Sequence, residues 1–267
     1  MPNNAKIHPT AVVDDKAKIA DDVEIGPYCI IGPDVTLKAG VKLRAHVNID
    51  CNCTVGEGTE IFPFVSFSDP QDLKFKGENS RLIIGKNNII REHVTMNPGT
   101  EADRMETTVG DNNLFMIGSH VAHDCIVGSN VIMANNATLA GHVIIEDGAI
   151  IGGLSAIRQK VRIGHNAMIG GMTGVEKDVI PYGLVMGDRG HLAGLNLVGL
   201  ERAGLPKKQI NGLRRAYKAI FLSDDDIFSS RVEKAANEFD EQELVQRMIA
   251  FVNGDSANSL TQPRKKA

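Results

Sequence analysis

Residues 109–145 read VGDNNLFMIGSHVAHDCIVGSNVIMANNATLAGHVII, and this stretch decides the fold. Every sixth residue from Val109 is apolar, and the run continues without exception as far as Val175. The same period of six runs through residues 13–67 and, more briefly, through residues 84–96. An α-helix requires a period of about 3.6 residues and an ordinary strand a period of about 2, so a period of six is typical of the hexapeptide repeat of a parallel β-helix.

A second inward position supports this interpretation. The fourth residue after each apolar anchor is small or β-branched, and Cys29, Cys53 and Cys125 occupy such positions. A narrow core of this kind explains why aromatic residues make up 4% of the chain and why Trp is absent. The cysteines, including Cys51, are interpreted as packing residues, because their spacing fits neither a disulfide framework nor a zinc site. Glycine often follows the anchor, where we expect a corner that needs backbone freedom.

Three hexapeptides make a triangular coil of 18 residues, and coils stack at about 4.8 Å. The periodic register breaks at 68–83 and 97–108, which are predicted to be loops. The repeat fades after Val175, so we expect a β-helix domain over 1–190. Helical patterns predict an α-helical C-terminal domain over 191–254, with helices opening at Pro206 and after Ser223 and a last one ending at Gly254, followed by a disordered tail over 255–267. The predicted fold class is mainly β, with a small α-helical part at the C-terminus.

Bulk properties exclude some partners. The 267 residues carry a formal net charge of −4, which argues against nucleic acid. No stretch approaches the roughly 20 apolar residues that span a bilayer, and the first nine residues lack the apolar core of a signal peptide. We therefore expect a cytoplasmic protein with no stable membrane insertion.

Three motifs narrow the function. Residues 70–74 read PQDLK, residues 120–125 read HVAHDC, and residues 134–142 read ANNATLAGH. With the length and the C-terminal helices, these motifs resemble the UDP-N-acetylglucosamine O-acyltransferase family over roughly residues 7–222. The resemblance implies a left-handed β-helix, a homotrimer with active sites between subunits, and no cofactor or metal. It also implies transfer of a 3-hydroxyacyl chain from acyl carrier protein to the 3-position of UDP-N-acetylglucosamine, the first step of lipid A biosynthesis.

The coil length brings candidate catalytic residues together. Steps of 18 residues place His123, Gly141 and Gln159 in one column, with Asp124 and His142 in the neighbouring column. Acyl transfer to a hydroxyl needs a base and a donor for the oxyanion, and an imidazole suits the first need near neutral pH. The resemblance assigns the base to His123, the oxyanion donor to the backbone of Gly141, and an orienting role to Asp124.

The resemblance also implies binding residues. Its substrate contacts are Gln71, Asp72, Lys74, Asn97, His120, His142, Arg158, Gln159, Asn196 and Arg202. Gly171 matches the position that gauges acyl length, and a glycine there suggests a long chain. Contacts to the acidic acyl carrier protein are expected from a basic helix face that carries Lys207, Lys208, Arg214 and Arg215.

Several residues depart from the family pattern and leave the acceptor open. Asn97 and Arg158 stand where the family commonly has His, and Val198 where it has Glu. Some relatives acylate a 3-amino sugar and form an amide, which stays an alternative. A further alternative is a γ-class carbonic anhydrase, which needs three histidines around zinc, in part from an adjacent subunit; His120, His123 and His142 are the candidates in this chain. A non-enzymatic β-helix scaffold is the last alternative. The N-acyltransferase of the same pathway fits poorly, because the repeat begins near the N-terminus.

Overall fold

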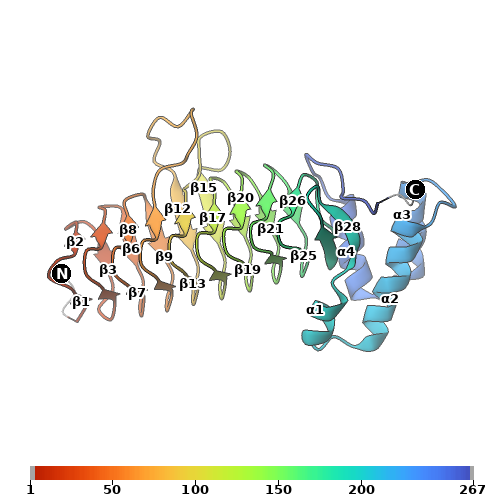
Figure 1. Cartoon of the computed structure of the whole chain (residues 1–267), viewed down its shortest axis with the longest axis horizontal. Helices are drawn as coiled ribbons and strands as arrows, with labels where there is room; N and C mark the ends of the chain where they lie inside the picture. The colour runs from red at the N-terminus through yellow and green to blue at the C-terminus, as the bar shows by residue number, and fades with distance from the viewer. Residues whose placement is uncertain (1–3, 265–267) are drawn as a thin grey trace.

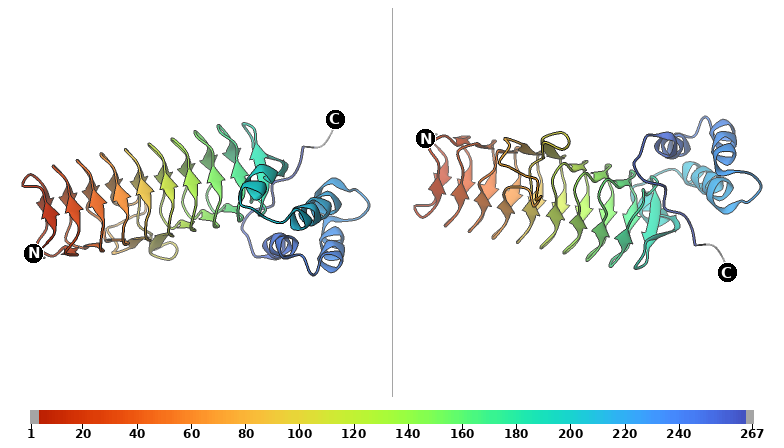
Figure 2. Two further views of the ribbon diagram at one scale, coloured as in Figure 1. Left: turned by 90° about the horizontal axis from the view of Figure 1, so that it is seen from below. Right: turned by 90° about the horizontal axis from the view of Figure 1, so that it is seen from above.

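The computed structural model describes residues 4–264 and contains a parallel β-helix followed by four α-helices (Figure 1). Outside the two insertions, strands of successive turns pair in parallel with an offset of 18 residues, as in the series Ile7, Ile25 and Leu43. The three strands of each turn belong to three different sheets, which run the length of the β-helix (Figure 2). The predicted mainly β fold with a parallel β-helix is therefore confirmed.

The strands are short because each occupies one side of a triangular coil. Sheet A contains β1 (Lys6–Ile7), β4 (Glu24–Ile25), β7 (Lys42–Leu43), β10 (Glu60–Ile61), β13 (Ile89–Ile90), β16 (Leu114–Phe115), β19 (Ile132–Met133), β22 (Ile150–Ile151), β25 (Met168–Ile169), β27 (Gly183–Met186) and β28 (His191–Leu195). Sheet B contains β2 (Val12–Val13), β5 (Ile30–Ile31), β8 (Asn48–Ile49), β11 (Ser66–Phe67), β14 (Thr95–Met96), β17 (His120–Val121), β20 (Thr138–Leu139), β23 (Ala156–Ile157) and β26 (Gly174–Val175). Sheet C contains β3 (Lys18–Ile19), β6 (Val35–Leu37), β9 (Cys53–Val55), β12 (Arg81–Ile84), β15 (Glu106–Val109), β18 (Ile126–Val127), β21 (Ile144–Ile145) and β24 (Arg162–Ile163).

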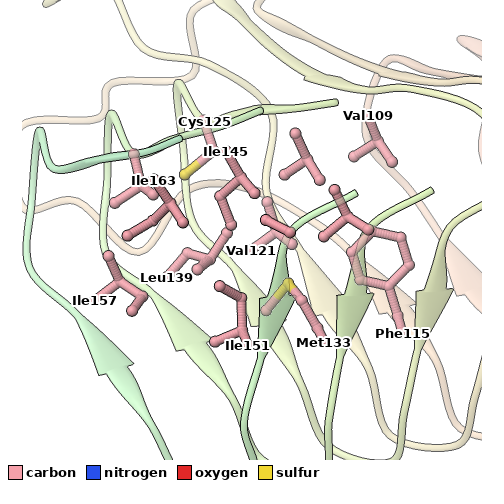
Figure 3. Close-up of a cluster of buried hydrophobic side chains, with 14 of the residues drawn as sticks. Val109, Phe115, Val121, Cys125, Met133, Leu139, Ile145, Ile151, Ile157 and Ile163 are labelled. Carbon is pink, nitrogen blue, oxygen red and sulfur yellow. The ribbon is translucent and has the colours of Figure 1, made fainter. Parts of the chain in front are cut away.

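The periodic apolar residues fill the interior. Figure 3 shows anchors from Val109 to Ile163 pointing inward from successive strands, with Cys125 beside them. Phe115, Val121 and Leu139 are fully buried. All four cysteines are buried free thiols, which agrees with their interpretation as packing residues.

The glycines after the anchors serve a different purpose from the one expected. Backbone freedom is not their role, because the left-handed conformation falls two residues later, for example at Gly58 and Asn112. A Cβ on Gly56 would instead collide with the backbone of Gly85 in the next coil. These glycines therefore allow the close approach of stacked coils.

Both insertions are shorter than predicted. The loops span 68–80 and 97–105, because β12 begins at Arg81 and β15 at Glu106, and these two strands pair over four residues. Leu82 and Thr107 are fully buried and restore the inward pattern before the predicted loop ends. Figure 1 shows both loops leaving the β-helix on the same side.

The helical part begins later than predicted. Residues 191–195 form β28, which pairs antiparallel with β27, so the first helix starts at Leu197. The helices are α1 (Leu197–Arg202), α2 (Lys207–Tyr217) with a π-helical extension η1 (Lys218–Leu222), α3 (Phe228–Glu238) and α4 (Glu243–Asn253). Within residues 4–264, no helix is long and apolar enough to cross a bilayer.

The segment 255–264, predicted to be disordered, packs against the β-helix instead. Asp178 is fully buried, and its carboxylate accepts hydrogen bonds from the Ser256 hydroxyl (2.6 Å) and Arg162 Nε (2.7 Å), while its backbone carbonyl accepts from the Thr261 amide (2.8 Å). A buried carboxylate requires such partners, and a polar tail supplies them. Residues 265–267 of the predicted tail lie outside the described residues.

The close approach of coils predicts that Gly56→Ala destabilises the protein. The added methyl group has to displace the backbone of Gly85, which should lower the free energy of unfolding by about 1–3 kcal/mol in urea titrations. Gly170→Ala is the matched control, since its nearest neighbour is the flexible Met186 side chain at 3.2 Å. Equal stability of the two variants would contradict the packing explanation.

Candidate functional site

The candidate active site lies at the corner between sheets B and C. His123 belongs to the turn between β17 and β18, and Asp124 makes this turn with a φ of 59°. In the next coil the same turn holds Gly141 and His142, and the His142 amide donates to the His123 carbonyl (3.0 Å). The structure thus brings these four residues together, as the coil arithmetic predicts.

His123 and Asp124 form a buried pair. His123 Nδ1 lies 2.9 Å from Asp124 Oδ2. The His123 side chain is 9% exposed and the Asp124 side chain is fully buried, so water competes little for this contact. With Nδ1–H donating to the carboxylate, Nε2 is left as the proton acceptor.

The pair shifts both ionisations in opposite directions. The hydrogen bond with Asp124 raises the pKa of His123, and this effect exceeds the opposing effect of burial. Burial acts to raise the pKa of Asp124, but hydrogen bonds from His123 and Thr100 outweigh it, so the pKa of Asp124 is lowered. The carboxylate therefore stays ionised beside an imidazole of increased basicity.

Gly141 leaves room for the His123 ring. A Cβ at this position would lie 2.5 Å from Cε1 and 2.6 Å from Nε2 of His123. The ring therefore lies directly beside the glycine backbone of the adjacent coil. Across residues 4–264, nothing accepts a hydrogen bond from the Gly141 N–H, which leaves this donor free beside the imidazole.

His142 and His120 flank the pair. His142 meets the His123 ring edge-on, with centroids 5.0 Å apart, and its Nδ1 lies 2.7 Å from Asp103 Oδ2. His120 Nδ1 lies 2.8 Å from the Thr95 hydroxyl. Burial lowers the pKa of His120, and the neighbouring His123 adds to this shift.

The predicted residues of the first loop lie near the pair. Gln71 and Lys74 are exposed, and Asp72 accepts a hydrogen bond from the Lys74 backbone (2.9 Å). The charge of Asp72 contributes to the raised pKa of His123, so this loop is close enough to act on the ionisation of the base. A cavity of about 460 Å³ between the two loops is lined by Asp72, Leu73, Lys74, Lys76, Glu78, Thr100, Glu101 and Ala102.

Two predicted contact residues have structural roles in the chain. Asn97 is 2% exposed, and its amide donates to the carbonyls of Ser68 and Asp69 (both 3.0 Å), so it anchors the start of the first loop. Asn196 caps α1, since Oδ1 accepts from the Gly199 amide (3.1 Å) while Nδ2 donates to Asn166 (3.0 Å).

Other predicted residues lie apart from His123. Arg158 and Gln159 are exposed one coil above Gly141, at the same corner. Arg202 ends α1, at the C-terminal end of the β-helix (Figure 1), and Lys207, Lys208, Arg214 and Arg215 are exposed on α2. Gly171 lies in the turn between β25 and β26, which is the corner between sheets A and B.

Three residues at the site escaped the sequence analysis. Thr100, Asp103 and Arg104 all belong to the loop 97–105, and they contact Asp124, His142 and the Asp124 carbonyl respectively. The hexapeptide period carries no information about a loop that leaves the repeat. The polar character of the loop is the one signal that pointed toward it.

The site contains few side chains that could bind a metal ion together. Within residues 4–264, the one group of ligand atoms close enough to share an ion comprises His123, Asp124 and His142. His120 is not part of this group.

Comparison with known proteins supports the family resemblance that the sequence motifs indicate. Residues 178–260 match the sequence profile described as UDP-N-acetylglucosamine O-acyltransferase, domain 2, and residues 3–39 and 106–141 match the bacterial transferase hexapeptide profile. The chain is 49% identical over 264 residues to the acyl-[acyl-carrier-protein]–UDP-N-acetylglucosamine O-acyltransferase of Azorhizobium caulinodans, covering 98% of this chain and 97% of the relative. It is 50% identical to the protein of the same name from Caulobacter vibrioides over 261 residues, covering 97% and 99%.

The chain belongs to the UDP-N-acetylglucosamine O-acyltransferase family. Solved structures agree: LpxA from Acinetobacter baumannii superposes with a TM-score of 0.92 at 43% identity, covering 96% of this chain and 99% of that one. The Arabidopsis UDP-N-acetylglucosamine acyltransferase gives a TM-score of 0.84 at 34% identity, covering 97% and 100%. The protein is therefore an acyltransferase, as the motifs predicted, and neither a carbonic anhydrase nor an inert scaffold.

The buried pair predicts the effect of Asp124→Asn on His123. Loss of the Asp124 charge removes the main cause of the raised pKa while the opposing effect of burial stays, so the pKa of His123 should fall. The measurement is an NMR titration of the His123 ring, assigned with His123→Gln. Asp147→Asn, at a different corner of the β-helix, should leave that titration unchanged; an unshifted His123 in Asp124→Asn would refute the pairing.

Proposed function

We propose that this acyltransferase moves a 3-hydroxyacyl chain from acyl carrier protein to the 3-hydroxyl of UDP-N-acetylglucosamine, the first step of lipid A biosynthesis. The observation that carries the mechanism is the His123–Asp124 pair beside the bare backbone of Gly141. The names of the Azorhizobium and Caulobacter relatives support the substrates. A cytoplasmic location remains a prediction from the sequence.

The chemistry needs no covalent enzyme intermediate. His123 Nε2 accepts the proton of the sugar hydroxyl while the hydroxyl oxygen attacks the thioester carbonyl carbon. The resulting oxyanion accepts a hydrogen bond from the Gly141 N–H. The carbon–sulfur bond then breaks, and the imidazolium returns its proton to the thiolate that leaves. Asp124 holds the ring in the required tautomer and stabilises its charged form.

The remaining predicted residues are proposed to bind the substrates. The exposed Gln71 and Lys74, with Asp72, offer polar contacts to the sugar nucleotide beside the base. The exposed cations of α2 suit an acidic carrier protein, because complementary charge speeds association. Small outward residues follow one another on sheet B between the corners of His123 and Gly171, namely Thr138, Ala156 and Gly174. This flat surface leaves space for an acyl chain that ends near Gly171.

A homotrimer would unite groups that lie apart within one chain. Arg202 and the α2 cations lie at the C-terminal end of the β-helix, beyond the coils that carry His123 (Figure 2), so a site that uses both sets draws on two subunits.

The corner between sheets A and B provides a suitable interface. Tyr28, His46, Phe64 and His93 stack there ring on ring, with centroids 5.0–5.2 Å apart. Tyr28 is 58% and Phe64 52% exposed, and the same corner continues with the exposed Leu154 and Met172. Exposed aromatic and apolar side chains gathered along one corner mark a protein interface.

Catalysis is tested with His123→Ala and Gly141→Ala. Loss of the base should reduce kcat by about 10²–10⁴-fold. A methyl group at position 141 should also reduce kcat, because it displaces the His123 ring. The assay offers several 3-hydroxyacyl carrier proteins against UDP-N-acetylglucosamine and its 3-amino analogue. Undiminished turnover in folded His123→Ala would remove the mechanism, and preference for the amine would reassign the product as an amide.

Assembly is tested with Phe64→Glu. A charge in the middle of the ring stack should shift the wild-type trimer toward monomers in sedimentation velocity runs. Ile227→Glu is the matched control, because Ile227 is 70% exposed but lies in the helical part. A monomeric wild type, or trimers of unchanged stability in Phe64→Glu, would contradict the proposed interface.

A further inference from the structure

The loop 97–105 holds the catalytic carboxylate at both of its oxygens. The Thr100 backbone amide donates to Asp124 Oδ1 (3.0 Å), and the Thr100 hydroxyl donates to Oδ2 (2.6 Å). Oδ2 also accepts from His123 Nδ1. Thr100 and the base, His123, are therefore both hydrogen-bonded to the Asp124 carboxylate. Thr100 is itself 2% exposed.

We propose that Thr100 is a positioning residue for this acyl transfer, which fixes the Asp124 carboxylate against the His123 ring through its hydroxyl and its backbone amide. This inference rests on the proposed function, because it assigns Thr100 a role through the proposed base. Thr100 reaches the reaction through Asp124 and His123.

Two donors from one residue fix an orientation that one donor cannot. A carboxylate with a single partner can rotate about the Cβ–Cγ bond, and an Asp side chain has a broad preference for that torsion. Attachment of Oδ1 and Oδ2 to the same residue prevents this rotation. The plane of the carboxylate, and with it the direction of the bond to His123, is therefore set by the loop.

The loop is held firmly enough for this task. The Thr100 carbonyl accepts from the amides of Asp103 and Met105 (both 3.2 Å), which closes a compact turn. Arg104 donates to the Asp124 carbonyl, which gives the turn a further hydrogen bond to the corner that carries His123 and Asp124. Gly99 packs directly against the backbone of Glu106, where any side chain would collide.

The Thr100 hydroxyl also affects the proton on His123. Charged and titratable groups around the ring are Asp124, Asp72 and Asp103, together with His120, His142 and Arg104. Asp124 Oδ2 accepts hydrogen bonds from both the Thr100 hydroxyl and the His123 ring. The hydroxyl therefore weakens the attraction between the carboxylate charge and the imidazolium. In Thr100→Val the Thr100 backbone amide still holds Oδ1, so the carboxylate keeps its contact with His123. Without the competing hydroxyl, Asp124 then holds the proton of His123 more strongly, and the base is freed at a higher pH.

The test compares Thr100→Val, which keeps the shape and loses the hydroxyl, with Thr100→Ser, which retains it. Thr36→Val on β6, in the N-terminal coils, is the matched control. The ring of His123 is titrated by NMR in the resting protein, and kcat/KM is followed against pH. We expect Thr100→Val to raise the midpoint of the His123 titration, to move the acidic limb of kcat/KM to higher pH, and to lower kcat/KM about tenfold at neutral pH.

Two comparisons sharpen the result. Thr100→Ser should restore the wild-type titration and rate. Asp103→Asn removes a negative charge near His123 and should move the titration the opposite way, to lower pH. Thermal unfolding of each variant is measured first, and Thr100→Ala replaces Thr100→Val if the valine does not fold.

An unshifted or lowered His123 midpoint in the folded variant would overturn the inference, as would failure of Thr100→Ser to restore it. A purely structural role for Thr100 would lower the rate at all pH values without moving the limb. The titration needs no turnover, so it stays informative even if His123→Ala retains activity. In that event the proposed mechanism fails, while the coupling from Thr100 to His123 is judged separately.

Discussion

The parallel pairing of each coil with the next, 18 residues later along most of the β-helix, is the constraint on which the rest of the structure depends. It aligns apolar anchors such as Ile25 and Leu43 into continuous inward rows, and each strand needs only two or three residues to take part. It also demands glycine wherever the coils approach too closely for a side chain, as at Gly56. Core, corners and surface columns all follow from this one repeat.

The candidate site uses the same constraint for chemistry. The coil spacing brings the His123 ring against the backbone of Gly141, and the absent side chain is what makes this contact possible. The loop 97–105 then adds what the repeat cannot provide, a partner for the buried Asp124 carboxylate. A regular scaffold supplies the positions of the base and its neighbouring N–H, and an irregular insertion sets their electrostatics.

Sequence reasoning succeeded where the repeat applies and failed where it is interrupted. The His123–Gly141 contact follows from counting, because register is exact along the coils. The contacts of Thr100 and Asp103 do not, since the path of a loop depends on tertiary contacts. The hydrogen bonds by which Asn97 anchors the first loop were likewise not predictable from its place in the repeat. The segment 255–264 looked disordered by composition, and its hydrogen bonds to the β-helix, such as that from Ser256 to the buried Asp178, explain its order.

The central claim is that the imidazole of His123 is the proton acceptor. The most direct test is to compare two pKa values in the wild-type enzyme: that of the acidic limb of kcat/KM and that of the His123 ring titrated by NMR. The account predicts that the two coincide, above the ordinary value for histidine. A rate that falls with a clearly different pKa, or that ignores the ionisation of His123, would contradict it.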